Sequence, residues 1–172
     1  MITLHAWPTP NAHKVSIMLE ECGLEYEVEA VDITTGDQFA PAFLDLSPNN
    51  RMPALVDDEG PEGKSVSIFE SGAILIYLAD KTGKFMPPSG NARYDVMQWL
   101  MFQMGNLGPI CGQAHHFRDA APDRVPYAIN RFTDEAGRLY GVMDRRMAET
   151  TYLAGDGYSI ADMACWPWVR VH

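Results

Sequence analysis

The sequence has few cysteines, and none of them is spaced like a metal ligand pair. Cys22, Cys111 and Cys165 are far apart and odd in number in a chain of 172 residues. This pattern argues against a disulfide scaffold or a C-x-x-C metal site, and it is typical of a reducing compartment. We therefore expect no metal and a cytoplasmic location.

Long hydrophobic runs are also missing. No stretch of eighteen apolar residues occurs, although 47% of the chain is hydrophobic, so no membrane span is expected. The first residues, Met1–His5, lack the basic segment and apolar run of a signal peptide. The chain is long enough for one large or two small domains.

Basic residues are scarce in the first half of the chain. Residues 1–83 hold 4 Lys/Arg and 14 Asp/Glu, whereas residues 84–172 hold 9 of each, so the net charge of −10 belongs to the first half. Such an acidic domain repels phosphate backbones, and nucleic-acid binding is not expected. The simplest role of the excess charge is solubility.

Hydrophobic spacing in residues 1–83 predicts alternating strands and helices. We expect strands at 2–6, 26–31, 52–56 and 66–69, and helices from Pro10 to Gly23, at 39–46 and at 71–82. The order β-α-β-α-β-β-α is that of a thioredoxin-like α/β domain.

The rest of the chain is predicted to be all-helical. Residues 84–90 are rich in proline and glycine and are typical of a linker. Apolar residues from Ile129 to Met147 then recur every three or four positions, and Ser159 with Asp162 indicates a capping box before an apolar helix. Residues 91–172 would form this second domain.

Two segments carry side chains suited to ligand binding. Pro53 enters a strand, which is one of the few places where a sheet tolerates proline, and a cis Met52–Pro53 bond would turn the Met52 backbone outward toward an extended ligand. Ser71 is expected at a helix N-terminus, where free N–H groups attract a carboxylate, and Glu70 beside it can hold an ammonium. Together they predict a site for a short peptide with an α-amino acid head group.

The turn after the first strand offers two donors for a sulfur. Thr9 and Asn11 can hydrogen-bond a thiolate near the positive end of a helix, and no cysteine of the chain lies in this turn. The reactive sulfur would then arrive with the ligand. Thr9 before Pro10 also suits a plain helix cap, but its neighbours at the predicted site favour a role in chemistry.

Other polar residues leave two interpretations open. Gln38, after the second strand, either bonds the ligand backbone or is a solvated amide. Arg51 either pairs with a ligand carboxylate or faces water. The adjacent residues His115 and His116 point to different helix faces, which is poor geometry for a shared metal.

These motifs resemble the glutathione transferases, most closely their bacterial nu class. The resemblance covers nearly the whole chain and is carried by the Thr-Pro-Asn turn at 9–11, Ser-Pro-Asn-Asn at 47–50, Phe-Glu-Ser-Gly-Ala-Ile at 69–74, Pro-Tyr-Ala-Ile at 126–129 and the segment 158–168. It implies a thioredoxin-like domain followed by the all-α glutathione transferase domain. The segment from Ser159 is usually followed in relatives by further helices, so we expect the helical domain to be incomplete and its last helix under-covered.

The resemblance also implies a site and partners. Glutathione, as cosubstrate, would be held by Gln38, Asn50, Arg51, Met52, Pro53, Glu70 and Ser71, with its thiolate at Thr9 and Asn11. Members of the wider family use a Tyr, Ser or Cys at that last place, and none stands here. A homodimer is implied, with Arg131 reaching across to the neighbour's ligand.

Three functions are consistent with this site. The first is reduction of disulfides by bound glutathione, which is the activity for which the nu class is noted. The second is conjugation of glutathione to electrophiles, which needs an apolar pocket beside the sulfur. The third is a binding module without catalysis.

Overall fold

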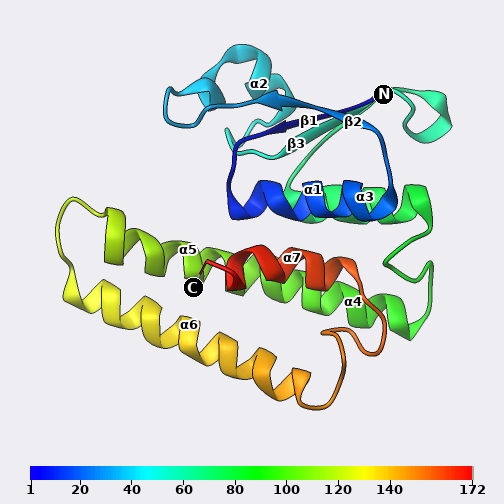
Figure 1. The fold of residues 1–172 in the computed structure, drawn as a ribbon. Coiled ribbons are helices and arrows are strands. Elements are labelled where there is room, and N and C mark those ends of the chain that lie inside the picture. The colour runs from blue at the N-terminus through cyan, green and yellow to red at the C-terminus, as the bar shows by residue number, and fades with distance from the viewer. Residues whose placement is uncertain (172) are drawn as a thin grey trace. The chain divides into compact units, whose positions relative to one another are not determined.

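The computed structural model describes residues 1–171 of the chain. They form two compact units, one from Met1 to Lys84 and one from Phe85 onwards, and each is described by itself (Figure 1). Within residues 1–171, no helix is long and apolar enough to cross a membrane.

The first unit is a four-stranded mixed sheet with three helices. The strands lie in the order β2-β1-β3-β4, with β1 and β2 parallel and the other neighbours antiparallel. Their bounds are β1 Ile2–Ala6, β2 Tyr26–Ala30, β3 Ala54–Asp57 and β4 Val66–Phe69, and the helices are α1 Pro10–Cys22, α2 Pro41–Leu46 and α3 Ser71–Thr82, with short 3₁₀ turns at Asp37–Phe39 and Pro61–Gly63.

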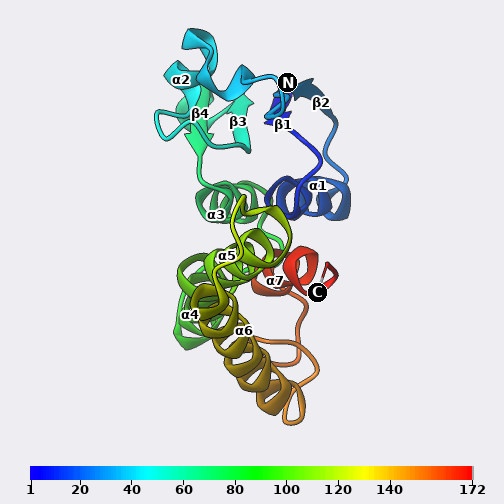
Figure 2. The same cartoon turned by 90° about the vertical axis from the view of Figure 1, so that its left-hand side faces the viewer.

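Helices α1 and α3 lie side by side against one face of the sheet, as the two views agree (Figures 1 and 2). The alternation in β1 buries Ile2, Leu4 and Ala6 and leaves the residues between them partly exposed. Val15 and Met18 of α1 are fully buried, as their spacing predicts. The apolar layer between helices and sheet is therefore the core of this unit.

The sequence and the structure differ at two element starts. β3 begins at Ala54 rather than Met52, because Pro53 has no N–H to donate and the pairing with β1 and β4 starts at Ala54. The expected helix at 39–46 is a 3₁₀ turn followed by α2 from Pro41, since Ala40 between them is extended.

The second unit is helical throughout its regular structure. Its helices are α4 Asn91–Phe102, α5 Gly108–His115, α6 Pro126–Met147 and α7 Ile160–Val169, and π-helical turns at Gln103–Leu107 and His116–Ala120 follow α4 and α5. α5 packs on α6, and α4 packs on α7. Both the capping box of Ser159 with Asp162 and the mixed α/β and helical fold class are confirmed.

Glycine lets α7 approach α5 closely. A Cβ at Gly112 would lie 3.3 Å from the ring of Trp168, and one at Gly108 would lie 3.4 Å from Nε1 of the same ring. Trp168 is half-buried and packs against the core of the second unit, a buried cluster that includes Leu107 and Leu139. Trp166 is 53% exposed, and Met163 is fully buried. The large apolar side chains of α7 therefore do not all face the core.

A buried carboxylate joins the end of β3 to α3. Asp57 is 1% exposed, accepts a hydrogen bond from Tyr77 Oη at 2.6 Å and forms an ion pair with Lys81 Nζ at 2.7 Å. Burial opposes ionisation, but the bonds from Lys81, Tyr77 and the Glu59 backbone N–H outweigh it and lower the Asp57 pKa.

This network predicts how stability depends on pH. Because the folded-state pKa of Asp57 is lowered, its contribution is complete above the unfolded value of about 3.9 and is lost as pH falls through the folded value. Asp57→Asn should cost about 1.5–3 kcal/mol at pH 7, and the difference from wild type should shrink in acid. Urea unfolding at pH 7 and pH 3 measures this, with the exposed Asp58→Asn as control. An equal loss at both pH values would contradict the assignment.

Candidate functional site

A cavity of about 190 Å³ opens where three strand ends of the first unit meet. His5 of β1 pairs with Ala54 of β3, and Ala54 also pairs with Phe69 of β4. The carboxyl ends of β1 and β4 therefore flank the start of β3. The segments that leave these ends carry the polar groups of the site.

The cavity brings together most of the residues predicted from the sequence. It is lined by Asn11, Asn49, Arg51, Met52, Pro53, Glu70 and Ser71. Six of these were expected, and Asn49 was not, although it lies in the same Ser-Pro-Asn-Asn motif. A volume below the roughly 300 Å³ of a small-ligand pocket suits an amino-acid head group better than a whole tripeptide.

Thr9 stands beside the cavity without lining it. It is the N-cap of α1, where its Oγ1 accepts a hydrogen bond from the Ala12 N–H at 3.4 Å. The same hydroxyl donates to Met52 Sδ at 3.4 Å. Capping and contact with the site residue Met52 thus occur together, so the two interpretations of Thr9 do not exclude each other.

The Met52–Pro53 peptide bond is cis, as expected. Met52 lines the cavity and is half-buried, whereas Pro53 is buried at the start of β3. Within residues 1–171, the Met52 backbone forms no hydrogen bond with another residue. Its N–H and C=O are therefore available to a ligand.

Glu70 holds a backbone conformation that side chains rarely adopt. Its φ is 69° and its ψ is 115°, and although it occupies the N-cap position of α3, its side chain does not cap the helix. The carboxylate is exposed and lines the cavity instead. Such backbone strain costs about 1–3 kcal/mol and gathers at functional sites.

Ser71 is hydrogen-bonded to a charged side chain, Lys14, that was not predicted from the sequence as part of the site. Ser71 is 6% exposed, and its Oγ accepts a hydrogen bond at 3.4 Å from Nζ of Lys14, which is 2% exposed. Lys14 lies four residues before Met18 on the buried face of α1. A lysine at that position of an apolar helix face was the signal that would have found it.

Besides Thr9, two other predicted residues of the first unit lie outside the cavity lining. Gln38 is in the 3₁₀ turn Asp37–Phe39, and its Oε1 is buried with no hydrogen-bond partner among residues 1–171. Asn50 adopts a positive φ of 48°, which asparagine tolerates, and its N–H donates to Ser47 O at 2.9 Å.

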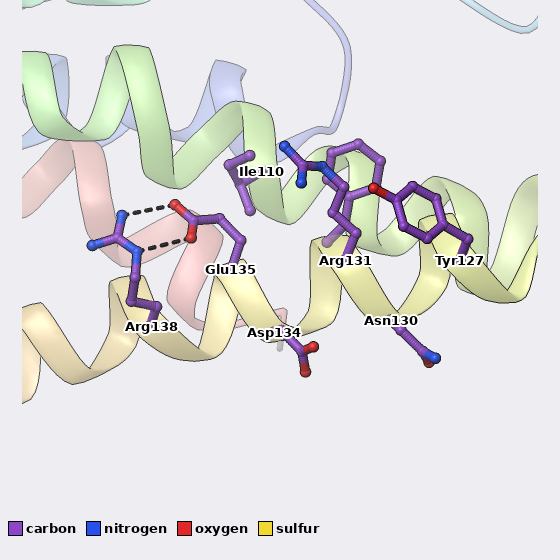
Figure 3. Close-up of a pocket in the computed structure, with 8 residues that line it drawn as sticks. Ile110, Tyr127, Asn130, Arg131, Asp134, Glu135 and Arg138 are labelled. Carbon is purple, nitrogen blue, oxygen red and sulfur yellow. Dashed lines mark hydrogen bonds and ion pairs between the residues drawn. The ribbon is translucent and has the colours of Figure 1, made fainter.

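Arg131 lies in the second unit, on α6. It lines a larger hollow of about 730 Å³ together with Tyr127, Asn130 and Arg138, where Arg138 forms two hydrogen bonds with Glu135 (Figure 3). This hollow is bigger than the first cavity, but most of its polar groups are exposed and two of them are paired with each other. We therefore place the candidate site at the strand ends of the first unit.

The cysteines do not supply a nucleophile to either cavity. All three are buried thiols that form no disulfide within residues 1–171. Burial raises the pKa of the Cys111 thiol, although a hydrogen bond with Tyr140 opposes this. A raised pKa keeps a thiol protonated and unreactive. Among residues 1–171, no group of three potential ligands is placed to hold a metal ion.

Comparisons with known proteins agree with this geometry. Residues 1–80 match the family model of the glutathione S-transferase N-terminal domain. The chain is 51% identical over 171 residues to the disulfide-bond oxidoreductase YfcG of Escherichia coli, covering 99% of this chain and 80% of that protein. The chain belongs to the glutathione transferase superfamily.

Solved structures of the superfamily share the fold closely. A glutathione transferase family member from Pseudomonas fluorescens, crystallised with two glutathione molecules, gives a TM-score of 0.96 at 48% identity over 98% of this chain and 75% of its own. One from Pseudomonas putida, with glutathione disulfide bound, gives 0.95 at 46% identity over 98% of this chain and 74% of its own. These relatives are longer than the present chain.

The strain at Glu70 can be measured through substitution. Glycine at position 70 tolerates a positive φ, whereas alanine keeps the strain and loses the carboxylate. Glu70→Gly should therefore be more stable than Glu70→Ala by about 1 kcal/mol, after allowing for the greater flexibility of glycine in the unfolded chain. Thermal unfolding of both variants tests this. A less stable glycine variant would show that Glu70 is not strained.

Proposed function

We propose that this protein binds glutathione and uses its thiol to reduce disulfides. The observation that carries the proposal is the meeting of Glu70 and Ser71 with Met52 and Asn11 around one cavity. A carboxylate, a hydroxyl at a helix N-terminus and an unpaired stretch of backbone are complementary to a γ-glutamyl peptide. The names of YfcG and of the glutathione-bound relatives support the same ligand and chemistry.

Each part of glutathione has a partner in this arrangement. The γ-glutamyl ammonium pairs with Glu70, and its α-carboxylate accepts bonds from Ser71 and the first N–H groups of α3. The cysteinyl backbone pairs with Met52. Arg51 faces a carboxylate of the ligand, while Gln38 and Asn50 contact the parts that extend beyond the cavity.

The sulfur lies beside the start of α1. Thr9 and Asn11 hold the thiolate there by hydrogen bonds, aided by the positive end of the helix. Thiol–disulfide exchange is fastest when the attacking thiol has a pKa near the ambient pH, so modest stabilisation suffices and no strong base is needed.

The reaction balances without any further cofactor. The glutathione thiolate attacks one sulfur of the substrate disulfide, the S–S bond breaks, and the other sulfur leaves as a thiolate that takes up a proton. A second glutathione then attacks the mixed disulfide. The products are glutathione disulfide and two substrate thiols.

The same proposal includes the class of the protein, its domains, its oligomeric state and its location in the cell. We place the chain in the nu class, with residues 1–83 as the glutathione-binding domain, 84–90 as linker and 91–172 as part of the helical domain. It acts as a homodimer in which Arg131 approaches the partner's ligand, and it works in the cytoplasm, where free thiols such as Cys22 persist.

One assay separates this function from its two rivals. Purified protein is given glutathione with a model disulfide or with a chloronitroaromatic electrophile. Turnover of the disulfide at the higher rate supports the proposal, and faster turnover of the electrophile supports conjugation. Turnover of neither substrate would leave a binding module and would contradict the proposal.

Substitutions can distinguish a role of Thr9 and Asn11 in turnover from simple helix capping by Thr9. Thr9→Ala should lower both stability, by about 1 kcal/mol for the lost cap, and disulfide turnover per folded molecule. Asn11→Ala should lower turnover without removing that cap, and Thr9→Ser should restore both properties. If Thr9→Ala lowers the melting temperature while turnover stays intact, Thr9 is a cap alone.

The source of the sulfur gives an independent prediction. Because the three cysteines are buried, brief alkylation of the folded protein with iodoacetamide should leave disulfide turnover unchanged after the reagent is removed. Mass spectrometry reports how many thiols reacted. Loss of turnover in proportion to modification of one cysteine would place the nucleophile in the protein and refute a ligand-borne sulfur.

A further inference from the structure

A charged side chain lies beneath the cavity and has no part in the chemistry described so far. Lys14 belongs to the second turn of α1 and is 2% exposed. Lysine is almost never fully buried unless its ammonium is engaged by polar partners. Its Nζ donates to Ser71 Oγ at 3.4 Å, and Ser71 lines the cavity.

The direction of this hydrogen bond constrains Ser71. An ammonium has three hydrogens and no lone pair, so Ser71 Oγ can only accept from Lys14. The Ser71 hydroxyl hydrogen must then point away from Nζ, toward a different acceptor. The contact with Lys14 thereby sets this hydroxyl as a donor.

The charge of Lys14 acts in the same direction. A buried ammonium is screened less than an exposed one, so its hydrogen bond polarises the Ser71 hydroxyl and makes it a stronger donor to a negative group. Ser71 is also the first residue of α3, where the helix end is positive. The side of the cavity at Ser71 therefore favours a negative group, while the exposed Glu70 carboxylate beside it favours a positive one.

We propose that Lys14 is a positioning residue that selects the α-carboxylate of the γ-glutamyl group by fixing Ser71 as its donor. This inference rests on the proposed function, because it assigns the polarity within the same cavity. Lys14 does not touch the ligand, and it acts through Ser71. Selection would show as a preference for ligands that carry this carboxylate.

The test compares two peptides that differ only in that group. Glutathione carries the α-carboxylate, and 4-aminobutyryl-cysteinyl-glycine lacks it but keeps the ammonium. Lys14→Met should weaken glutathione binding about tenfold, the scale of a lost charge-assisted interaction, and leave binding of the second peptide unchanged in calorimetry. Lys64→Met, an exposed lysine paired with Glu62, is the matched control for loss of one charge and should alter neither affinity.

A second experiment tests whether Lys14 acts through Ser71. Ser71→Ala should lose the same selectivity, and the double variant Lys14→Met/Ser71→Ala should bind glutathione no more weakly than Ser71→Ala alone. An equal loss for both peptides, or additive losses in the double variant, would mean that Lys14 only supports the fold and would overturn the proposal. Unchanged binding of glutathione by Lys14→Met would also overturn it.

The unmutated protein provides the readout if Lys14→Met fails to fold. In protein labelled with ¹⁵N-lysine, the Lys14 Nζ resonance should shift when glutathione is added and stay in place with 4-aminobutyryl-cysteinyl-glycine. The same shift with both peptides, or with neither, would overturn the proposal. If the wild-type protein binds neither peptide, the proposed function fails as well, and this result is distinct from binding of glutathione without selectivity.

Discussion

The pairing of β3 with both of its neighbours is the constraint on which the site depends. Ala54 is fully buried and lies opposite His5 on one side and Phe69 on the other. Leu55, on the opposite face of β3, is also fully buried, so a slip of one residue in this register would exchange side chains of different size between two packed faces. That register brings the segment before β3 beside the turn after β1 and the start of α3.

Two carboxylates of the first unit, those of Asp57 and Glu70, illustrate how this frame is used. Asp57 is buried at one end of β3 and is satisfied by Tyr77 and Lys81, so it joins the sheet to α3. Glu70, at the cavity end of the same sheet, stays exposed in a strained conformation. One acid serves the fold, whereas the other, in the function that we propose, is held ready for a ligand at a cost to stability.

Much of this could be predicted from the sequence because the signals were local. The alternation of apolar and polar residues predicted β1, and glycines indicated the ends of α1 and α3. Ser159 with Asp162 indicated the start of α7. The Lys14–Ser71 contact could not be predicted from the sequence, because it joins residues 57 positions apart. Only the packing of α1 on α3 creates this contact. The π-helical turns after α4 and α5 likewise carry no local signature that distinguishes them from an α-helix.

A crystal structure of the protein grown with glutathione would locate each part of the ligand directly. We expect density for the γ-glutamyl group between Glu70 and Ser71, the cysteinyl backbone paired with Met52, and the sulfur beside Thr9 and Asn11. Glutathione bound elsewhere, or the peptide reversed so that its glycine carboxylate meets Ser71, would contradict this expectation.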